Sequence, residues 1–170
     1  VEFTGGGDFN QGGLPESALV QADDGNFYGT TLTGSVFGPE NFVNGTIFRM
    51  TPTGGLTTLV EFTQSESEEK GTRPKADLFQ GDDGLLYGTT SSGGIDFNGT
   101  IFRVTPFGGL TTLVKFKNEG NGQGSRPEAP LIQGSDGDFY GTTEGDEGFD
   151  HGTVFSMTPE GLVTNLVVFT

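Results

Sequence analysis

One motif constrains the fold of this chain more than any other feature of its sequence, because it occurs three times. The segment Asp-Gly-x-x-Tyr-Gly-Thr-Thr occupies residues 24–31, 83–90 and 136–143. Each copy is followed by a Gly-Thr-x-Phe segment that ends in Thr-Pro, and then by a segment that ends in Val-x-Phe. Self-similarity of this kind, with successive copies 59 and 53 residues apart, indicates a tandem-repeat architecture.

Each unit contains four segments with the character of short strands. In the first unit these are residues 18–21, 27–31, 46–51 and 56–63. The Asp-Gly pair predicts a tight primed turn between the first two strands, because such a turn needs positive φ. Four consecutive strands per unit are typical of a β-propeller blade. A β-sandwich also has many short strands, but it gives no reason for three units to share one sequence.

The predicted fold is therefore all-β, with three four-stranded antiparallel β-propeller-type blades plus one extra N-terminal strand. That strand is residues 1–4, whose sequence Val-Glu-Phe-Thr matches the end of each later unit. The predicted organisation is residues 1–4 as the terminal strand of a preceding repeat, 5–63 as blade repeat 1, 64–117 as blade repeat 2 and 118–170 as blade repeat 3. Residues 64–70 favour a helix by composition but have no apolar face, so we interpret them as a solvated loop.

The repeated pattern also resembles a known family. The combination P-x-A-x-L-x-Q-x-x-D-G-x-x-Y-G-T-T, followed by G-T-x-F-x-x-T-P-x-G and then L-V-x-F, is similar to the bacterial tandem-repeat family known as GloVer repeats. More distantly, it resembles the blades of streptogramin lyase-like propellers. The first resemblance implies secreted or surface-anchored bacterial proteins with no assigned chemistry. No motif of this chain matches the catalytic residues of the lyase-like propellers.

Composition excludes several classes of partner. The formal net charge of −15 gives a surface that repels nucleic acids and anionic membranes. No apolar run approaches the length of a membrane span, so no membrane insertion is expected. The absence of cysteine excludes disulfides and thiolate metal sites.

Three blades are too few for a single closed ring, because propellers use at least four. Two apolar blade faces are therefore expected to remain exposed. We expect copies of the chain to be the partner, in a closed ring of two chains, in a longer array or in a filament. The residues predicted to mediate assembly lie at the two ends of the chain: Val1, Glu2, Phe3 and Thr4, and Val167, Val168, Phe169 and Thr170.

Residues that recur in all three units are interpreted as structural, because one requirement of the fold is then met three times. The tyrosines of the repeated motif are expected to pack between blades. The glutamines before each Asp-Gly turn are expected to bind backbone groups, although a polar row along a channel is the alternative. These residues are Tyr28, Tyr87 and Tyr140, and Gln21, Gln80 and Gln133.

Ligand-binding candidates lie in the loops between the second and third strands, where aromatic and polar residues gather. Glycans are the expected ligand class, with sites at Phe42, Asn44, Phe97, Asn98, Phe149 and Asp150. Asp146, Glu147 and Asp150 are a candidate Ca²⁺ site, since hard cations need several oxygens from such loops. Otherwise no cofactor is expected. The single histidine, His151, is interpreted as a surface turn residue.

Asn44 and Asn98 each begin an Asn-Gly-Thr sequence, which matches the N-glycosylation acceptor pattern. An Asn-Gly turn before a strand explains both without a glycan.

Taken together, the sequence predicts a non-enzymatic, extracellular or cell-surface structural repeat protein. It would assemble through blade faces or strand edges into a larger ring, array or filament. The alternative is a carbohydrate-binding propeller lectin. Both readings spread function over identical repeats, whereas catalysis usually needs one asymmetric group of residues.

Overall fold

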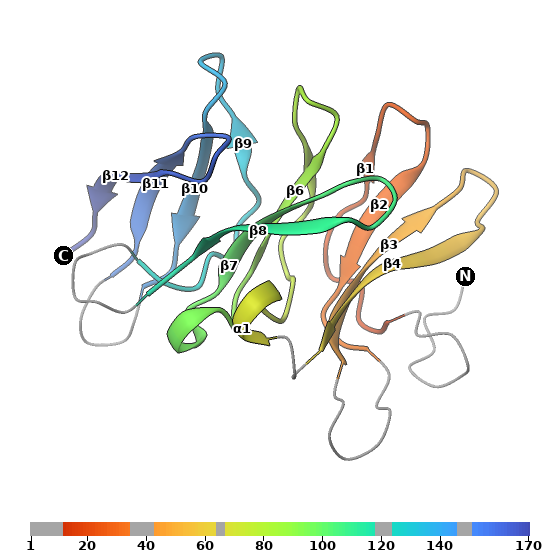
Figure 1. Cartoon of the computed structure of the whole chain (residues 1–170), viewed down its shortest axis with the longest axis horizontal. Helices are drawn as coiled ribbons and strands as arrows, with labels where there is room; N and C mark the ends of the chain where they lie inside the picture. Colours follow the sequence, from red (N-terminus) through yellow and green to blue (C-terminus); the bar gives the residue numbers. More distant parts are fainter. Residues whose placement is uncertain (1–11, 35–42, 64–66, 118–123, 146–150) are drawn as a thin grey trace.

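The computed structural model describes residues 12–34, 43–63, 67–117, 124–145 and 151–170. Within these ranges the chain forms three four-stranded antiparallel sheets, and in each sheet the strands follow chain order. The three sheets fan out side by side (Figure 1). Among the described residues, no helix is long and apolar enough to cross a membrane.

The three sheets are equivalent strand by strand. The first contains β1 (Val20–Gln21), β2 (Phe27–Thr31), β3 (Val43–Met50) and β4 (Leu56–Thr63). The second contains β5 (Phe79–Gln80), β6 (Leu86–Thr90), β7 (Thr100–Val104) and β8 (Leu110–Lys115). The third contains β9 (Ile132–Gln133), β10 (Phe139–Thr143), β11 (Thr153–Met157) and β12 (Val163–Val168). The prediction of three four-stranded blades is confirmed. The extra N-terminal strand, residues 1–4, lies outside the described residues.

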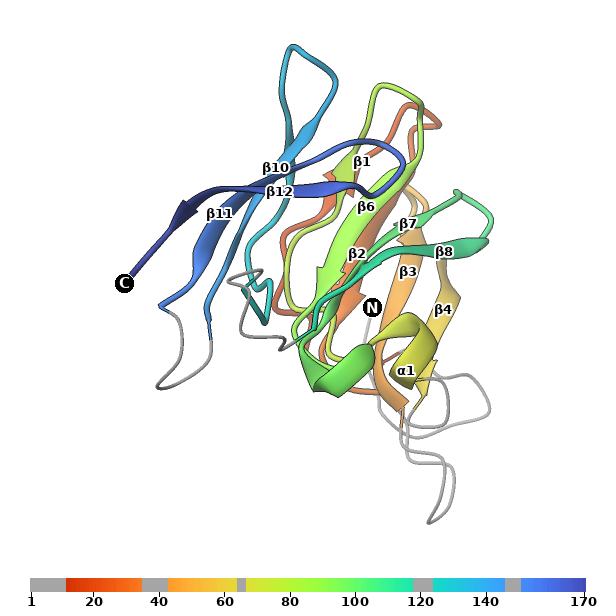
Figure 2. The same cartoon turned by 60° about the vertical axis from the view of Figure 1, so that its left-hand side comes forward.

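The turn at each Asp-Gly pair differs from the predicted two-residue primed turn. In the first blade the Ala22 N–H donates to Asn26 O at 3.0 Å, and the Gly25 N–H donates to Ala22 O at 2.8 Å. Three residues therefore form the loop, and only Gly25, with φ 79°, has a positive φ. A three-residue loop needs one glycine in the left-handed region, which is why Asp-Gly suffices here. The three Asp-Gly hairpins extend from the same end of the molecule in both views (Figures 1 and 2).

A buried threonine pair joins the second and third strands of every blade. The hydroxyl groups of Thr31 and Thr46 lie 2.8 Å apart, and the Thr46 N–H donates to the Thr31 hydroxyl at 3.1 Å. The same pair recurs as Thr90–Thr100 and Thr143–Thr153. The last threonine of the Gly-Thr-Thr segment therefore joins the second and third strands of each blade beside the loop that connects them.

One short helix corrects the interpretation of residues 64–70 as a loop. Residues Ser67–Lys70 form α1, a single helical turn, and residues 64–66 lie outside the described residues. Contacts with β8 stabilise this helix. Thr112 donates to Glu69 O at 2.7 Å, and Lys115 forms an ion pair with the Glu69 carboxylate at 2.7 Å. Tertiary contacts with β8 thus replace the apolar face that the segment lacks. A second short element, the 3-10 helix η2 (Ile95–Phe97), lies between β6 and β7.

Candidate assembly flanks

The hydrophobic core of this protein lies between the blades. We call the face of a blade on the side of the preceding repeat its leading face, and the face on the side of the following repeat its trailing face. The core between the first two blades joins Tyr28, Ile47 and Phe62 of the first trailing face to Leu78 and Phe102 of the second leading face. The core between the second and third blades uses equivalent residues: Tyr87, Ile101 and Phe116 on one side and Leu131, Phe139, Phe155 and Met157 on the other.

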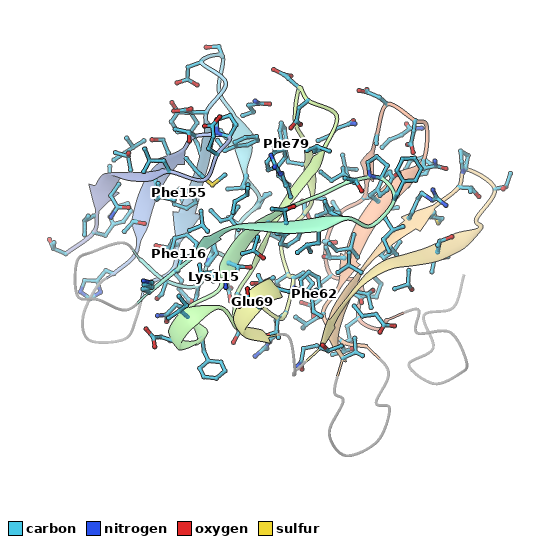
Figure 3. All side chains as sticks on the ribbon, viewed as in Figure 1. Phe62, Glu69, Phe79, Lys115, Phe116 and Phe155 are labelled. Carbon is cyan, nitrogen blue, oxygen red and sulfur yellow. The ribbon has the colours of Figure 1, made fainter. Side chains whose placement is uncertain are left out.

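Aromatic pairs mark both junctions at the same place in the repeat. The rings of Phe62 and Phe102 are 5.7 Å apart, and those of Phe116 and Phe155 are 5.9 Å apart. Figure 3 shows Phe116 and Phe155 between the second and third sheets. Pairs at this distance contribute roughly 0.5–1.5 kcal/mol beyond the area that they bury.

A glutamine clamps each junction near the Asp-Gly turns. The Gln80 amide donates to Gly84 O within its own blade at 3.3 Å, while its oxygen accepts from the Asp23 N–H of the preceding blade at 3.1 Å. Gln133 does the same with Gly137 O and with the Asp82 N–H. The prediction that these glutamines bind backbone groups is confirmed. The structure adds that one of the two bonds crosses the junction.

The aspartate of each Asp-Gly turn accepts a hydrogen bond from the tyrosine of the same motif. The distance is 2.7 Å for Tyr28 and Asp24, and 2.9 Å for Tyr87 and Asp83. Burial, followed by the hydrogen bond to the aspartate, raises the pKa of both tyrosines to about 12. The hydrogen bond from the Asn26 side chain is the largest effect that lowers the pKa of Asp24. These carboxylates are therefore already engaged in their turns.

A backbone bond and an ion pair complete the junctions. The Arg73 N–H donates to Asn44 O of the preceding blade at 2.8 Å, and the Arg126 N–H donates to Asn98 O at the same distance. Both arginines have positive φ, 61° and 52°. Lys75 of the second blade forms an ion pair with Glu128 of the third at 2.9 Å.

The trailing face of the third blade is exposed, although it carries the same residue types as the two buried trailing faces. Phe169 is 50% exposed, whereas Phe116, its equivalent in the second blade, is 2% exposed. Val167 is also exposed, and Tyr140 and Val154 are half-buried. We name this surface the trailing flank: Tyr140, Val154, Val167 and Phe169. Val168 is exposed on the opposite face of the sheet, where it pairs with Thr153.

The leading face of the first blade is exposed in part. Leu19 is 49% exposed, whereas Leu78, its equivalent in the second blade, is 4% exposed. Phe27 and Met50 are half-buried at positions that are fully buried in the other blades. Phe48, on the same face, is buried. We name this surface the leading flank: Leu14, Leu19, Phe27 and Met50.

Of the residues predicted to mediate assembly, Val167, Val168, Phe169 and Thr170 lie in the described part of the chain and are all exposed. Val1, Glu2, Phe3 and Thr4 lie outside the described residues. Sequence reasoning expected two exposed blade faces, but it did not name Tyr140 or Val154, nor any residue of the leading flank. Comparison of equivalent positions in the three repeats could have found them.

The predicted glycan-binding residues are only partly within the described chain. Phe97 is 64% exposed on η2, while Asn98 beside it is 5% exposed and Asn44 is half-buried. The structure therefore does not present Asn98 and Phe97 on one surface. Phe42, Phe149 and Asp150 lie outside the described residues. Of the two glycosylation candidates, Asn98 is buried, and Asn-Gly there introduces a glycine with φ 87° before β7.

The candidate Ca²⁺ ligands Asp146, Glu147 and Asp150 also lie outside the described residues. In the part of the chain that the structure describes, no group of three or more acidic or histidine residues is arranged to hold a metal ion. His151 is exposed beside Gly152.

The fold and the repeated junctions define a β-propeller-type tandem-repeat protein. A family model described as the Gloeobacter/Verrucomicrobia repeat matches residues 2–170, and the chain belongs to this family. This finding confirms the resemblance to a bacterial tandem-repeat family.

Comparison with solved structures supports the same architecture. An X-ray structure described as that of a candidate gluconolactonase is similar, with a TM-score of 0.52 and 14% sequence identity. The likeness covers 89% of this chain and 48% of that chain, so this chain spans about half the length of the solved protein. At this identity it concerns the fold alone. No curated protein matches the sequence.

Proposed function

We propose that this chain is a non-enzymatic structural module of an extracellular or cell-surface protein, and that it assembles with units of its own kind through its blade flanks. The observation that carries the proposal is the trailing flank. It exposes Phe169 and Val167, whose equivalents Phe116 and Val114 pack into the core between blades. A surface that is built to be buried in two of three repeats is a binding surface in the third.

The distribution of reactive groups supports a structural role rather than catalysis. The polar residues that recur in the repeats are engaged in holding turns and junctions together, as the Asp24–Tyr28 and Gln80–Asp23 bonds show. Catalysis usually concentrates several activated groups at one place. The extracellular location rests on the resemblance to the bacterial tandem-repeat family.

The test is the assembly state of the purified chain at increasing concentration, measured by analytical ultracentrifugation and imaged by negative-stain electron microscopy. We expect oligomers, rings or filaments that are weakened by Phe169→Asp. Phe107 supplies a matched control, because it is 88% exposed on the turn between β7 and β8 and lies outside both flanks. Phe107→Asp should leave assembly unchanged. A chain that stays monomeric at all concentrations would contradict the proposal.

Carbohydrate binding is the second candidate, and one observation favours it. Phe97 presents an exposed ring on η2 and has a positive φ of 60°, a conformation that is rare for an aromatic residue. An exposed ring held in this way is a stacking platform for a sugar. A glycan array should then show binding that Phe97→Ala abolishes and Phe107→Ala does not affect. An array without any binder would remove this candidate.

A further inference from the structure

We infer that the trailing flank binds the leading flank of a second copy, head to tail and in the register of the two internal junctions. This inference rests on the proposed assembly and specifies its geometry. Two alternative contacts, trailing flank to trailing flank and strand edge to strand edge, would bring different residues together.

The two flanks carry complementary hydrogen-bonding groups. At both internal junctions a glutamine oxygen accepts from a backbone N–H of the preceding blade. On the leading flank, Gln21 makes the bond within its own blade, to Gly25 O at 3.3 Å. Within the described residues its oxygen has no donor. On the trailing flank, the Ser135 N–H occupies the place of Asp23 and Asp82 and, in the same part of the chain, has no acceptor. A second copy in the internal register brings these two groups together.

A second pair of backbone groups matches in the opposite sense. Leu14 is the equivalent of Arg73 and Arg126, and its φ of 55° is close to theirs. Those two arginines donate their N–H to Asn44 O and Asn98 O, and His151 occupies the equivalent place in the third blade. In the described part of the chain, neither the Leu14 N–H nor the His151 carbonyl has a partner. The leading flank is therefore already shaped for this bond.

The direction of these groups favours head-to-tail contact. The trailing flank offers a donor at Ser135 and an acceptor at His151, whereas the leading flank offers an acceptor at Gln21 and a donor at Leu14. A trailing flank that faced another trailing flank would leave the Gln21 oxygen and the Leu14 N–H of both copies without partners. A heterologous contact of this kind closes into a ring or continues as a filament. Two copies would supply six blades, a number within the range of closed propellers.

One feature of the copy-to-copy junction differs from the internal ones. Lys75 lies between Glu16 of the first blade, which it attracts, and Glu128 of the third, to which it is bound at 2.9 Å. In the proposed contact, Glu128 of one copy meets the position of Glu16 in the next, so that two carboxylates replace an ion pair. The junction between copies is therefore weaker than the internal junctions, and salt that screens the repulsion strengthens it.

Cysteine cross-linking tests the register directly, because the chain has no cysteine of its own. A backbone N–H···O=C bond brings the two Cα atoms to roughly 5 Å, within the range of a disulfide. Separately purified Leu14→Cys and His151→Cys variants are mixed under mild oxidation. Head-to-tail contact predicts a heterodimer linked between the two variants. Asn44→Cys combined with Arg73→Cys in one chain is the positive control, because that pair must close within the chain.

Arg73→Cys mixed with His151→Cys is the negative control, because residue 73 lies in an internal junction. A His151→Cys homodimer without the heterodimer would indicate trailing-to-trailing contact and overturn the inference. An assembly that forms without either disulfide, while the positive control closes, would overturn the register but leave the proposed function intact. The absence of any assembly in ultracentrifugation would overturn both.

The carboxylate pair has its own test. Glu16→Gln should tighten association about two- to fivefold at low salt and reduce the effect of added salt. Glu160→Gln removes the same charge at an exposed turn outside the flanks, so it controls for net charge. If the two variants behave alike, Glu16 does not face Glu128 across the junction.

Discussion

Phe116 and Phe169 occupy the same position in successive repeats, but their surroundings differ. Phe116 packs edge-on against Phe155 and is buried, whereas Phe169 directly follows β12 and is half exposed. The sheets that carry them pair in the same strand order. The comparison shows that a blade of this chain does not bury its own apolar surface. The neighbouring blade does so, and stability is therefore shared between adjacent units.

The polar groups show the same contrast. Tyr87 is buried and its pKa is raised mainly by burial, whereas for Tyr140 the hydrogen bond to Asp136 is the main cause of the raised pKa. The Asp-Tyr hydrogen bond recurs in all three blades, whereas no described residue of a following blade covers Tyr140. The following predictions test this division.

The largest expected effect is the loss of a buried ring at an internal junction. Phe116→Ala should lower the free energy of unfolding by about 3–5 kcal/mol, because it removes the ring and leaves a cavity beside Phe155. Phe169→Ala makes the same chemical change on the trailing flank. Measured in urea at low protein concentration, it should cost about 0.5 kcal/mol or less.

An equal decrease in the free energy of unfolding for Phe116→Ala and Phe169→Ala would contradict the proposed difference between the two positions. Phe169 would then be buried in solution, in which case its cost should grow with protein concentration. A cost independent of concentration would mean that the flank is covered by the chain's own residues.

Glycine substitutions test contacts within a blade. Their effect on stability should be the same in the second blade and in the third, which carries the trailing flank. A Cβ at Gly71 would overlap the Thr90 hydroxyl and lie 2.7 Å from that of Thr100, and φ there is +81°. Gly124 meets Thr143 and Thr153 in the same way in the third blade. Gly71→Ala and Gly124→Ala should therefore each cost about 2–4 kcal/mol, from backbone strain and overpacking.

Gly84→Ala is the matched control, because φ is +77° but no atom lies within 4 Å of the added Cβ. It should cost only about 1–2 kcal/mol, the strain of the left-handed conformation. Chemical denaturation measures all three variants. A much smaller loss of stability for Gly124→Ala than for Gly71→Ala would show that the third blade is less ordered than the second. The exposure of its trailing flank would then not reflect a missing neighbour alone.

The repeat explains why the fold was predictable and the site only partly so. Strands and turns depend on local sequence, and three copies of Tyr-Gly-Thr-Thr with its Asp-Gly turn report the same local structure three times. The turn type was predicted wrongly because Asp-Gly serves both two- and three-residue loops. The one-turn helix α1 was missed because its support comes from Thr112 and Lys115, more than forty positions away.

The residues of the candidate site are those that no neighbouring blade covers in the described part of the chain, and local sequence does not encode this. Val167 and Phe169 were predicted because they end the last repeat. Leu19 and Leu14 were not named, although an exposed face on the first blade was expected. The Gln80–Asp23 bond across the junction likewise became visible only with the blades in contact.

The smallest expected effect is on stability in alkali, and it separates internal tyrosines from the flank tyrosine. The pKa of Tyr28 and Tyr87 rises from 10.0 to about 12 on folding. The unfolded chain therefore loses these protons first, and the stabilisation is complete below pH 10 and is lost as the pH rises through about 12. The temperature of thermal unfolding should therefore fall steeply between these pH values.

Tyr87→Phe should reduce this fall more than Tyr140→Phe does, because burial adds to the rise in the tyrosine pKa only where a neighbouring blade covers the ring. An equal reduction by the two variants would show that the Asp-Tyr hydrogen bond alone sets the shift, and that the neighbouring blade contributes nothing to it.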